Sequence, residues 1–120
     1  MKCEVEVTDE FGDWWDSPSI EEQESVAYSI RLLEEKGVAL GHPHTSNIAG
    51  SRHSHMRELR VQHAGQPYRV LYAFDPRRMA VLLIGADKTG QDRWYEIFIP
   101  IADDLYDQHV ASLKAEGLIK

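Results

Sequence analysis

The chain has 120 residues, enough for one hydrophobic core, and we expect a single domain over residues 1–120. Its hydrophobic residues make up 42% of the sequence but are too dispersed for a membrane-spanning segment. Because the first residues lack an apolar signal region, we expect a cytoplasmic protein that makes no membrane contact. Cys3, the one cysteine in the sequence, excludes an internal disulfide and a cysteine-rich zinc site.

The net charge of −7 is distributed unevenly along the chain. Residues 1–36 carry 3 basic and 11 acidic side chains, whereas residues 37–102 carry 8 basic and 5 acidic side chains. The total argues against strong long-range attraction of nucleic acid. The distribution still allows RNA to meet a more basic sheet whose other side is covered by an acidic helical layer.

The first third of the chain predicts a strand and then helices. Polar and apolar residues alternate over residues 2–8, which is typical of a short strand. A short helix or turn that buries its aromatic rings is indicated by Phe11, Trp14 and Trp15. A longer amphipathic helix follows and ends near Gly37. Its N-cap is either Ser17 or Ser19, the latter in a capping box with Glu22.

Residues 38–55 form a long polar segment without clear periodicity, which predicts a loop. Four histidines in it form two His-x-His pairs, His42 with His44 and His53 with His55. Imidazole is a common metal ligand. Because neither a carboxylate nor a thiol stands between the pairs, we expect a solvated loop and no metal site.

Three antiparallel strands are predicted next, over residues 57–61, 68–74 and 79–85. These runs are rich in β-branched and aromatic residues, and turns containing Gly, Pro and Asp separate them. Turns centred on residues 65–66 and 76–77 would pair Tyr72 with Leu59 on one side and Val81 on the other. The sheet formed by these strands organises the rest of the chain.

The alternation of side chains along these strands predicts two different faces. The expected core face carries Leu59, Val61, Val70, Tyr72, Phe74, Val81 and Leu83. The opposite, polar face carries Glu58, Arg60, Gln62 and Arg69, and leads into the loop that contains Lys88. Two arginines and a lysine are therefore expected to converge on one side of the sheet.

The C-terminal part of the chain predicts helices. Residues 93–98 form a first helical segment, and we expect Pro100 to kink or restart the helix. Apolar residues then recur at helical spacing from Ala102 to Leu113, and His109 lies on this stripe as a packing histidine. The predicted order is β-α-α-β-β-β-α. We expect an α+β fold in which a small antiparallel sheet has helices packed on one face and the other face partly open.

Familiar catalytic motifs are missing from the sequence, including a P-loop, a dinucleotide fingerprint, a nucleophile elbow and a zinc-protease helix. What remains is Arg, Lys, Tyr and His around the sheet. Metal-free RNA cleavage needs a proton taken from the 2′-hydroxyl, stabilisation of the phosphorane-like charge, and a proton for the leaving 5′-oxygen. Arg can hold a phosphate through two parallel hydrogen bonds, and Lys, Tyr or His can exchange protons.

Five short segments occur in an informative order: RELRV at 57–61, YRVLYAFDPRR at 68–78, LLIGADKTG at 82–90, WYE at 94–96 and IPIAD at 99–103. Together they resemble the HigB-like branch of the RelE/ParE toxin superfamily, also called phage-derived Gp-type toxins. The resemblance covers nearly the whole chain. It implies a RelE-type fold and a toxin that cuts mRNA on the translating ribosome without a metal or other cofactor. It also implies a partner antitoxin with a helix-turn-helix domain, through which alone the toxin would meet DNA.

The resemblance implies roles for individual residues. Arg69 matches the arginine that holds the scissile phosphate, and Lys88 matches a basic residue near the cleavage site. Tyr95 lies near the position of a C-terminal tyrosine in some relatives. RNA contacts are expected from Arg57, Arg60, His53 and His55. Both of these arginines flank Glu58, so local ion pairs are the alternative for each.

Two other functions remain open at this point. Toxins of this type are usually basic, whereas this chain is acidic. One alternative is a toxin that poisons a topoisomerase and leaves mRNA intact. The other is an inactive relative that binds the antitoxin as a co-repressor of their operon.

Overall fold

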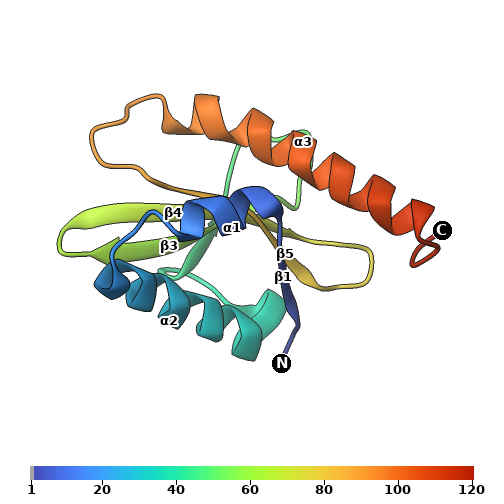
Figure 1. Ribbon diagram of the computed structural model, residues 1–120, viewed down its shortest axis with the longest axis horizontal. Helices are drawn as coiled ribbons and strands as arrows, with labels where there is room; N and C mark the ends of the chain where they lie inside the picture. The colour runs from blue at the N-terminus through green and yellow to red at the C-terminus, as the bar shows by residue number, and fades with distance from the viewer. Residues whose placement is uncertain (1) are drawn as a thin grey trace.

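The computed structural model describes residues 2–120, and these residues have the predicted α+β fold (Figure 1). The elements follow in the order β1 (Val5–Val7), α1 (Asp9–Trp15), α2 (Ile20–Lys36), the 3-10 helix η1 (Gly37–Ala39), β2 (Thr45–Asn47), β3 (Arg57–His63), β4 (Gln66–Phe74), β5 (Ala80–Asp87) and α3 (Trp94–Ala115). Over the described residues, five strands form one sheet in the order β1-β5-β4-β3-β2. The β1–β5 pair is parallel and the other pairs are antiparallel. No helix within residues 2–120 is long and apolar enough to cross a membrane.

Helices cover both faces of the sheet, so the prediction that they share one face is wrong. In Figure 1, α3 lies on one side of the sheet and α2 on the other. The core on the α1 and α2 side includes Phe11, Val26, Leu33, Leu59, Val70 and Tyr72. The core on the α3 side includes Leu71, Leu83, Trp94, Ile99 and Leu105. The reason lies in β4, whose apolar residues are buried on both faces, as in a strand at the centre of a two-sided core.

The β3–β4 hairpin turns one residue earlier than the sequence predicted. Ala64 and Gly65 have φ angles of 50° and 79°, as a two-residue hairpin turn requires. Because of this turn, Arg60 pairs with Arg69 and not with Leu71. Moving a turn by one residue changes the pairing by two residues, which leaves every side chain on its predicted face. The observed turn therefore places the two arginines directly opposite each other.

The β4–β5 pairing contains an irregularity between Leu71 and Tyr72. Beyond it, Tyr72 pairs with Leu82, whereas the sequence predicted Val81. An extra residue in one strand reverses the alternation of side chains relative to the partner strand. Val81 and Leu83 consequently lie in the core under α3, and their predicted place on the same face as Tyr72 is wrong.

Two further elements differ from the sequence prediction. Strand β2 lies within the segment that was expected to be a loop, and Thr45 anchors it by donating to the carbonyl of Glu58 at 2.8 Å. Helix α3 runs without interruption through Pro100, so a restart at this residue is wrong. Pro100 cannot donate to the carbonyl of Glu96, but both residues are exposed, so water can satisfy that carbonyl. The structure also selects Ser19 as the N-cap of α2, in a reciprocal capping box with Glu22.

Asp75, at the end of β4, ties the turn before β5 to α3. Its side chain is fully buried and accepts hydrogen bonds from Arg77 at 2.8 Å and His109 at 2.9 Å. The prediction of a packing histidine at position 109 is thereby confirmed. Arg77 continues the network to Glu6 on β1 at 3.0 Å. Burial raises the pKa of Asp75, but hydrogen bonds from His109, Arg77 and the backbone lower it by more, so the pKa lies below its usual value.

We expect Asp75→Asn to lower the free energy of unfolding by about 2–3 kcal/mol at pH 7, because charge-assisted hydrogen bonds to a buried group are lost. A carboxyl whose pKa is depressed by folding stabilises the protein above its unfolded pKa of about 3.9, and this contribution disappears as the pH falls through the folded pKa. The difference between wild type and Asp75→Asn should therefore shrink as the pH is lowered from 7 to 3. Urea unfolding at both pH values measures it, with the exposed Asp92→Asn as control. If the stability difference between wild type and Asp75→Asn is the same at both pH values, the conclusion that folding lowers the pKa of Asp75 is wrong.

Candidate functional site

Five polar side chains lie together near the hairpin end of the sheet: Glu58, Arg60, Arg69, Lys88 and Tyr95. Glu58 is their centre. Its Oε1 accepts a hydrogen bond from the Tyr95 hydroxyl at 2.7 Å and lies 3.4 Å from Arg69 Nε, while its Oε2 lies 3.3 Å from Arg60. The Lys88 ammonium lies 5.2 Å from the centre of the Tyr95 ring. The predicted convergence of two arginines and a lysine is confirmed, and Tyr95 links the lysine to the arginines.

Regular secondary structure brings this group together. Glu58 and Arg60 are two residues apart on β3 and therefore point to the same face. Arg69 stands opposite Arg60 in the register of the hairpin. Tyr95 is in the first turn of α3, and Lys88 directly follows β5. Each side chain thus projects from, or next to, an element with a packed core, which fixes the geometry of the group.

Glu58 is a site residue that sequence reasoning treated only as an ion-pair partner. It is 3% exposed, and besides Tyr95 its carboxylate accepts a hydrogen bond from Ser46 at 2.6 Å. A buried carboxylate is tolerated when cations and hydrogen-bond donors surround it, as they do here. The signal in the sequence was an acidic residue between two arginines on a strand. Its neighbours Tyr95 and Ser46 could not be found without the tertiary structure.

The two arginines differ in their exposure. Arg69 is 5% exposed and donates one hydrogen bond to the carbonyl of Tyr68 at 3.0 Å. Its Nε lies close to Glu58 but makes no well-directed hydrogen bond within residues 2–120. The Arg60 side chain is 35% exposed. The pair therefore presents one guanidinium held in the protein interior and one that reaches solvent.

Tyr95 is held in its protonated form. Burial is the largest influence on the phenol and raises its pKa, and the hydrogen bond to Glu58 raises the pKa further. Arg69 lowers the pKa, but by less than these two effects raise it. At neutral pH the hydroxyl thus donates to Glu58, and its oxygen can accept a hydrogen bond from a ligand. Together with the lysine and two arginines, the group offers positive charge for a phosphate and a path for a proton.

A cavity of about 750 Å³ opens beside the two arginines, between α2 and β3. Arg60 and Arg69 line it on the strand side. The α2 side is lined by Glu21, Glu24, Ser25, Tyr28 and Ser29. Val61 also lines the cavity, yet its side chain belongs to the core under α2, on the face opposite Arg60. The cavity therefore extends around the edge of β3, where sequence reasoning had placed nothing.

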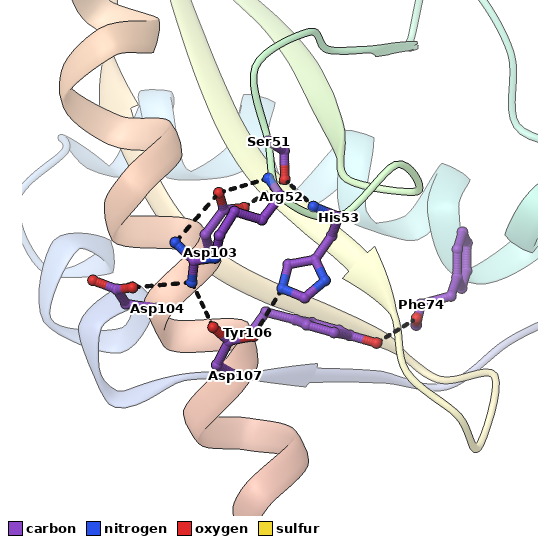
Figure 2. A network of polar contacts seen from close by, with 8 residues as sticks. All are labelled: Ser51, Arg52, His53, Phe74, Asp103, Asp104, Tyr106 and Asp107. Atoms are coloured by element: carbon purple, nitrogen blue, oxygen red, sulfur yellow. Dashed lines mark hydrogen bonds and ion pairs between the residues drawn. The ribbon is translucent and has the colours of Figure 1, made fainter.

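The other predicted RNA-binding residues lie elsewhere. Arg57 alternates with Glu58 onto the opposite face of β3 and donates to Asn47 at 3.3 Å. Figure 2 shows His53 next to α3, where its Nε2 lies 2.8 Å from Asp107. The His55 ring packs 5.3 Å from the ring of Tyr106. Asp107 is about 18 Å from Tyr95 along the axis of α3. RNA contacts by these three basic residues stay predictions.

The segment before β3 is fastened to α3 by a network of polar contacts (Figure 2). The Arg52 side chain binds Asp104 at 3.1 Å and also contacts Asp107. The backbone N–H of Arg52 donates to Asp103 at 2.9 Å, and the Ser51 hydroxyl donates to the same carboxylate. Within residues 2–120, no three His, Cys, Asp or Glu side chains are grouped so that they could hold a metal ion. The network thus positions a loop that the sequence predicted to be solvated.

We expect Arg69→Met to lower the free energy of unfolding by about 3 kcal/mol, because it leaves the Glu58 carboxylate buried without one of its cations. Glu58→Gln combined with Arg69→Met should cost clearly less than the sum of the two single changes. Urea unfolding of the four proteins completes this double-mutant cycle. Arg93→Met, which removes an exposed arginine, is the control and should change stability by about 0.5 kcal/mol or less. Additive single changes would show that the two buried groups are not coupled.

Comparison with known proteins places the chain in a family. Residues 13–107 match the family described as "Phage derived protein Gp49-like (DUF891)". HigB2 of Mycobacterium tuberculosis (strain ATCC 25618 / H37Rv), named as a candidate toxin, is 39% identical over 103 residues, which cover 84% of this chain and 51% of HigB2. HigB3 of the same organism, also named as a candidate toxin, is 42% identical over 105 residues, covering 87% of this chain and 90% of HigB3. The chain thus spans about half the length of HigB2 and most of HigB3, and it belongs to the Gp49-like family.

Proposed function

We propose that this protein is the toxin of a type II toxin–antitoxin pair and inhibits translation as a ribosome-dependent endoribonuclease that cleaves mRNA. The main support for the proposal is the pairing of Arg60 with Arg69, which lie directly opposite each other in the β3–β4 hairpin. Tyr95 and Lys88 lie beside this pair. Two relatives named as candidate HigB toxins support it. The partner would be a helix-turn-helix antitoxin, as the resemblance to HigB-like toxins implies.

In the proposed reaction, the 2′-oxygen attacks the adjacent phosphorus and the bond from phosphorus to the 5′-oxygen breaks. Arg69 and Arg60 bind the non-bridging oxygens and stabilise the charge that develops there. The Tyr95 oxygen accepts the 2′-hydroxyl proton while its own proton passes to Glu58, to which it is already hydrogen-bonded at 2.7 Å. Lys88 supplies the proton for the leaving 5′-oxygen. The product is a 2′,3′-cyclic phosphate, or the 3′-phosphate after hydrolysis.

The distribution of charge also fits a protein that meets RNA with one side. The acidic first third of the chain forms β1, α1 and α2. The more basic middle forms β3, β4, β5 and the first turns of α3, which carry the candidate site. RNA would therefore approach the arginines from the side of α3, and its phosphates would be repelled from the acidic helical layer on the opposite face.

Inducing the chain alone in a bacterial host, and mapping new 5′ ends of mRNA soon after, tests the proposal. Wild type should arrest growth and cut within translated codons. Arg60→Gln, Lys88→Gln and Tyr95→Phe should each reduce cleavage by about 10- to 100-fold, because each removes a contact to the reacting phosphate, its proton donor or the proton path. The exposed Arg31→Gln and Lys114→Gln are matched controls and should cut like wild type.

The other outcomes point to other functions. Growth arrest with intact mRNA would contradict the nuclease and favour a topoisomerase as the target. Neither arrest nor cuts, from protein shown to be folded, would favour a co-repressor that only binds the antitoxin. The buried Arg69 is left out of the set because its loss is expected to affect folding as well as activity.

A further inference from the structure

We propose that the cavity between α2 and β3 is a nucleobase pocket that selects guanine next to the cleaved phosphate. This inference rests on the proposed function and deepens it, because it gives the nuclease a preferred nucleotide. The cavity volume of about 750 Å³ lies within the range of small-ligand sites. Since Arg60 and Arg69 line it, a nucleotide whose phosphate meets these arginines can place its base in the same cavity.

The two walls of the cavity have opposite chemistry. The strand wall presents the guanidinium groups of Arg60 and Arg69. The helix wall presents the carboxylates of Glu21 and Glu24, which are exposed and can only accept hydrogen bonds when ionised. A nucleotide has the matching arrangement, with a negative phosphate at one end and N–H donors on the base edge at the other. A second phosphate would be repelled by the helix wall, so the cavity suits a base and not a continuing backbone.

Guanine fits two carboxylates better than the other bases do. Its N1–H and its exocyclic amino group are adjacent donors, so one carboxylate can accept both in parallel. Adenine and cytosine offer an amino group beside an acceptor nitrogen, and uracil offers one N–H between two carbonyl groups. An acceptor-only wall therefore ranks guanine first and uracil last.

Aromatic side chains complete the pocket. Tyr28 is 55% exposed, although it lines the cavity, and it is one helical turn from Glu24 on the same side of α2. Its ring offers a surface on which a base can stack, as single-stranded RNA bases do in proteins. His63 forms part of the opposite wall, and the hydroxyl of Ser25 holds its Nδ1 at 2.8 Å. The width of the pocket is thus set by groups from both elements.

Arg69 gives a separate reason to expect a ligand here. It lines the cavity and is 95% buried, and it donates one hydrogen bond to the carbonyl of Tyr68. Its Nε lies 3.4 Å from Glu58 but makes no well-directed hydrogen bond within the described part of the chain. Buried arginines ordinarily satisfy their donors. Oxygens of a phosphate at the strand wall would accept further hydrogen bonds from this guanidinium. The base attached to that phosphate would then lie near Glu24 and Tyr28.

Titration of the four nucleoside 3′-monophosphates, followed by NMR of the full chain, tests the pocket directly. We expect guanosine 3′-monophosphate to bind about tenfold more tightly than uridine 3′-monophosphate and to shift the signals of Tyr28 and His63. Glu24→Gln, alone and with Glu21→Gln, should remove most of this preference. Tyr28→Ala should weaken all four nucleotides to a similar degree, since stacking is tolerant of sequence. Glu35→Gln, an exposed carboxylate elsewhere on α2, is the matched control and should keep the preference.

Equal binding of the four nucleotides, or a guanine preference that survives both glutamate changes, would overturn the pocket. Mapping of mRNA cleavage separates this inference from the nuclease itself. Cuts enriched beside guanine in wild type, and evenly spread in Glu24→Gln, would support both. Cuts without any base preference would contradict the proposed guanine pocket but would still support the proposed nuclease activity. Selective binding of guanosine 3′-monophosphate without any cleavage would keep the pocket and overturn the nuclease.

Discussion

The buried carboxylate of Glu58 is the interaction on which the candidate site depends. A carboxylate in a protein interior must be surrounded by cations and donors, because it has lost its water. Here these partners are Arg60, Arg69 and Tyr95, the groups that the proposed function assigns to the reacting phosphate and the proton path. Their positions are therefore fixed by contacts within the protein, which is what the proposed electrostatic stabilisation of a transition state requires. The same coupling links stability to function, so that a change at Glu58 disturbs the whole group.

Much of the sheet could be predicted from the sequence, because alternation along a strand is a local property. Arg60 and Arg69 were placed on one face even though the predicted pairing was wrong by two residues, since an even error does not exchange the faces. The irregularity beside Tyr72 is different: one extra residue reverses the faces, and no turn residue marks it in the sequence. The position of α3 could not be predicted either, because the pattern of a helix does not say which face of a sheet it covers.

The residues of the candidate site could likewise be predicted only in part from the sequence. Arg60, Arg69, Lys88 and Tyr95 could be named from the sequence because strand alternation and a resemblance pointed to them. The role of Glu58 and the cavity beside α2 could not, since they depend on contacts between elements far apart in the chain. Arg57 was expected to contact RNA together with Arg60, yet residues at odd spacing on a strand face opposite ways, so the two arginines lie on different faces of β3.

The tight turn at Ala64 and Gly65 has a consequence for how this site can change during evolution. The two arginines meet only because the chain between them has a particular length. A single residue inserted within β3 before the turn would send Arg60 to the other face or require a compensating bulge. Paired insertions would keep the face but separate the arginines. The length of the hairpin thus constrains the site as strongly as the identity of the arginines does, whereas a change of length in the surrounding loops leaves the pair in place.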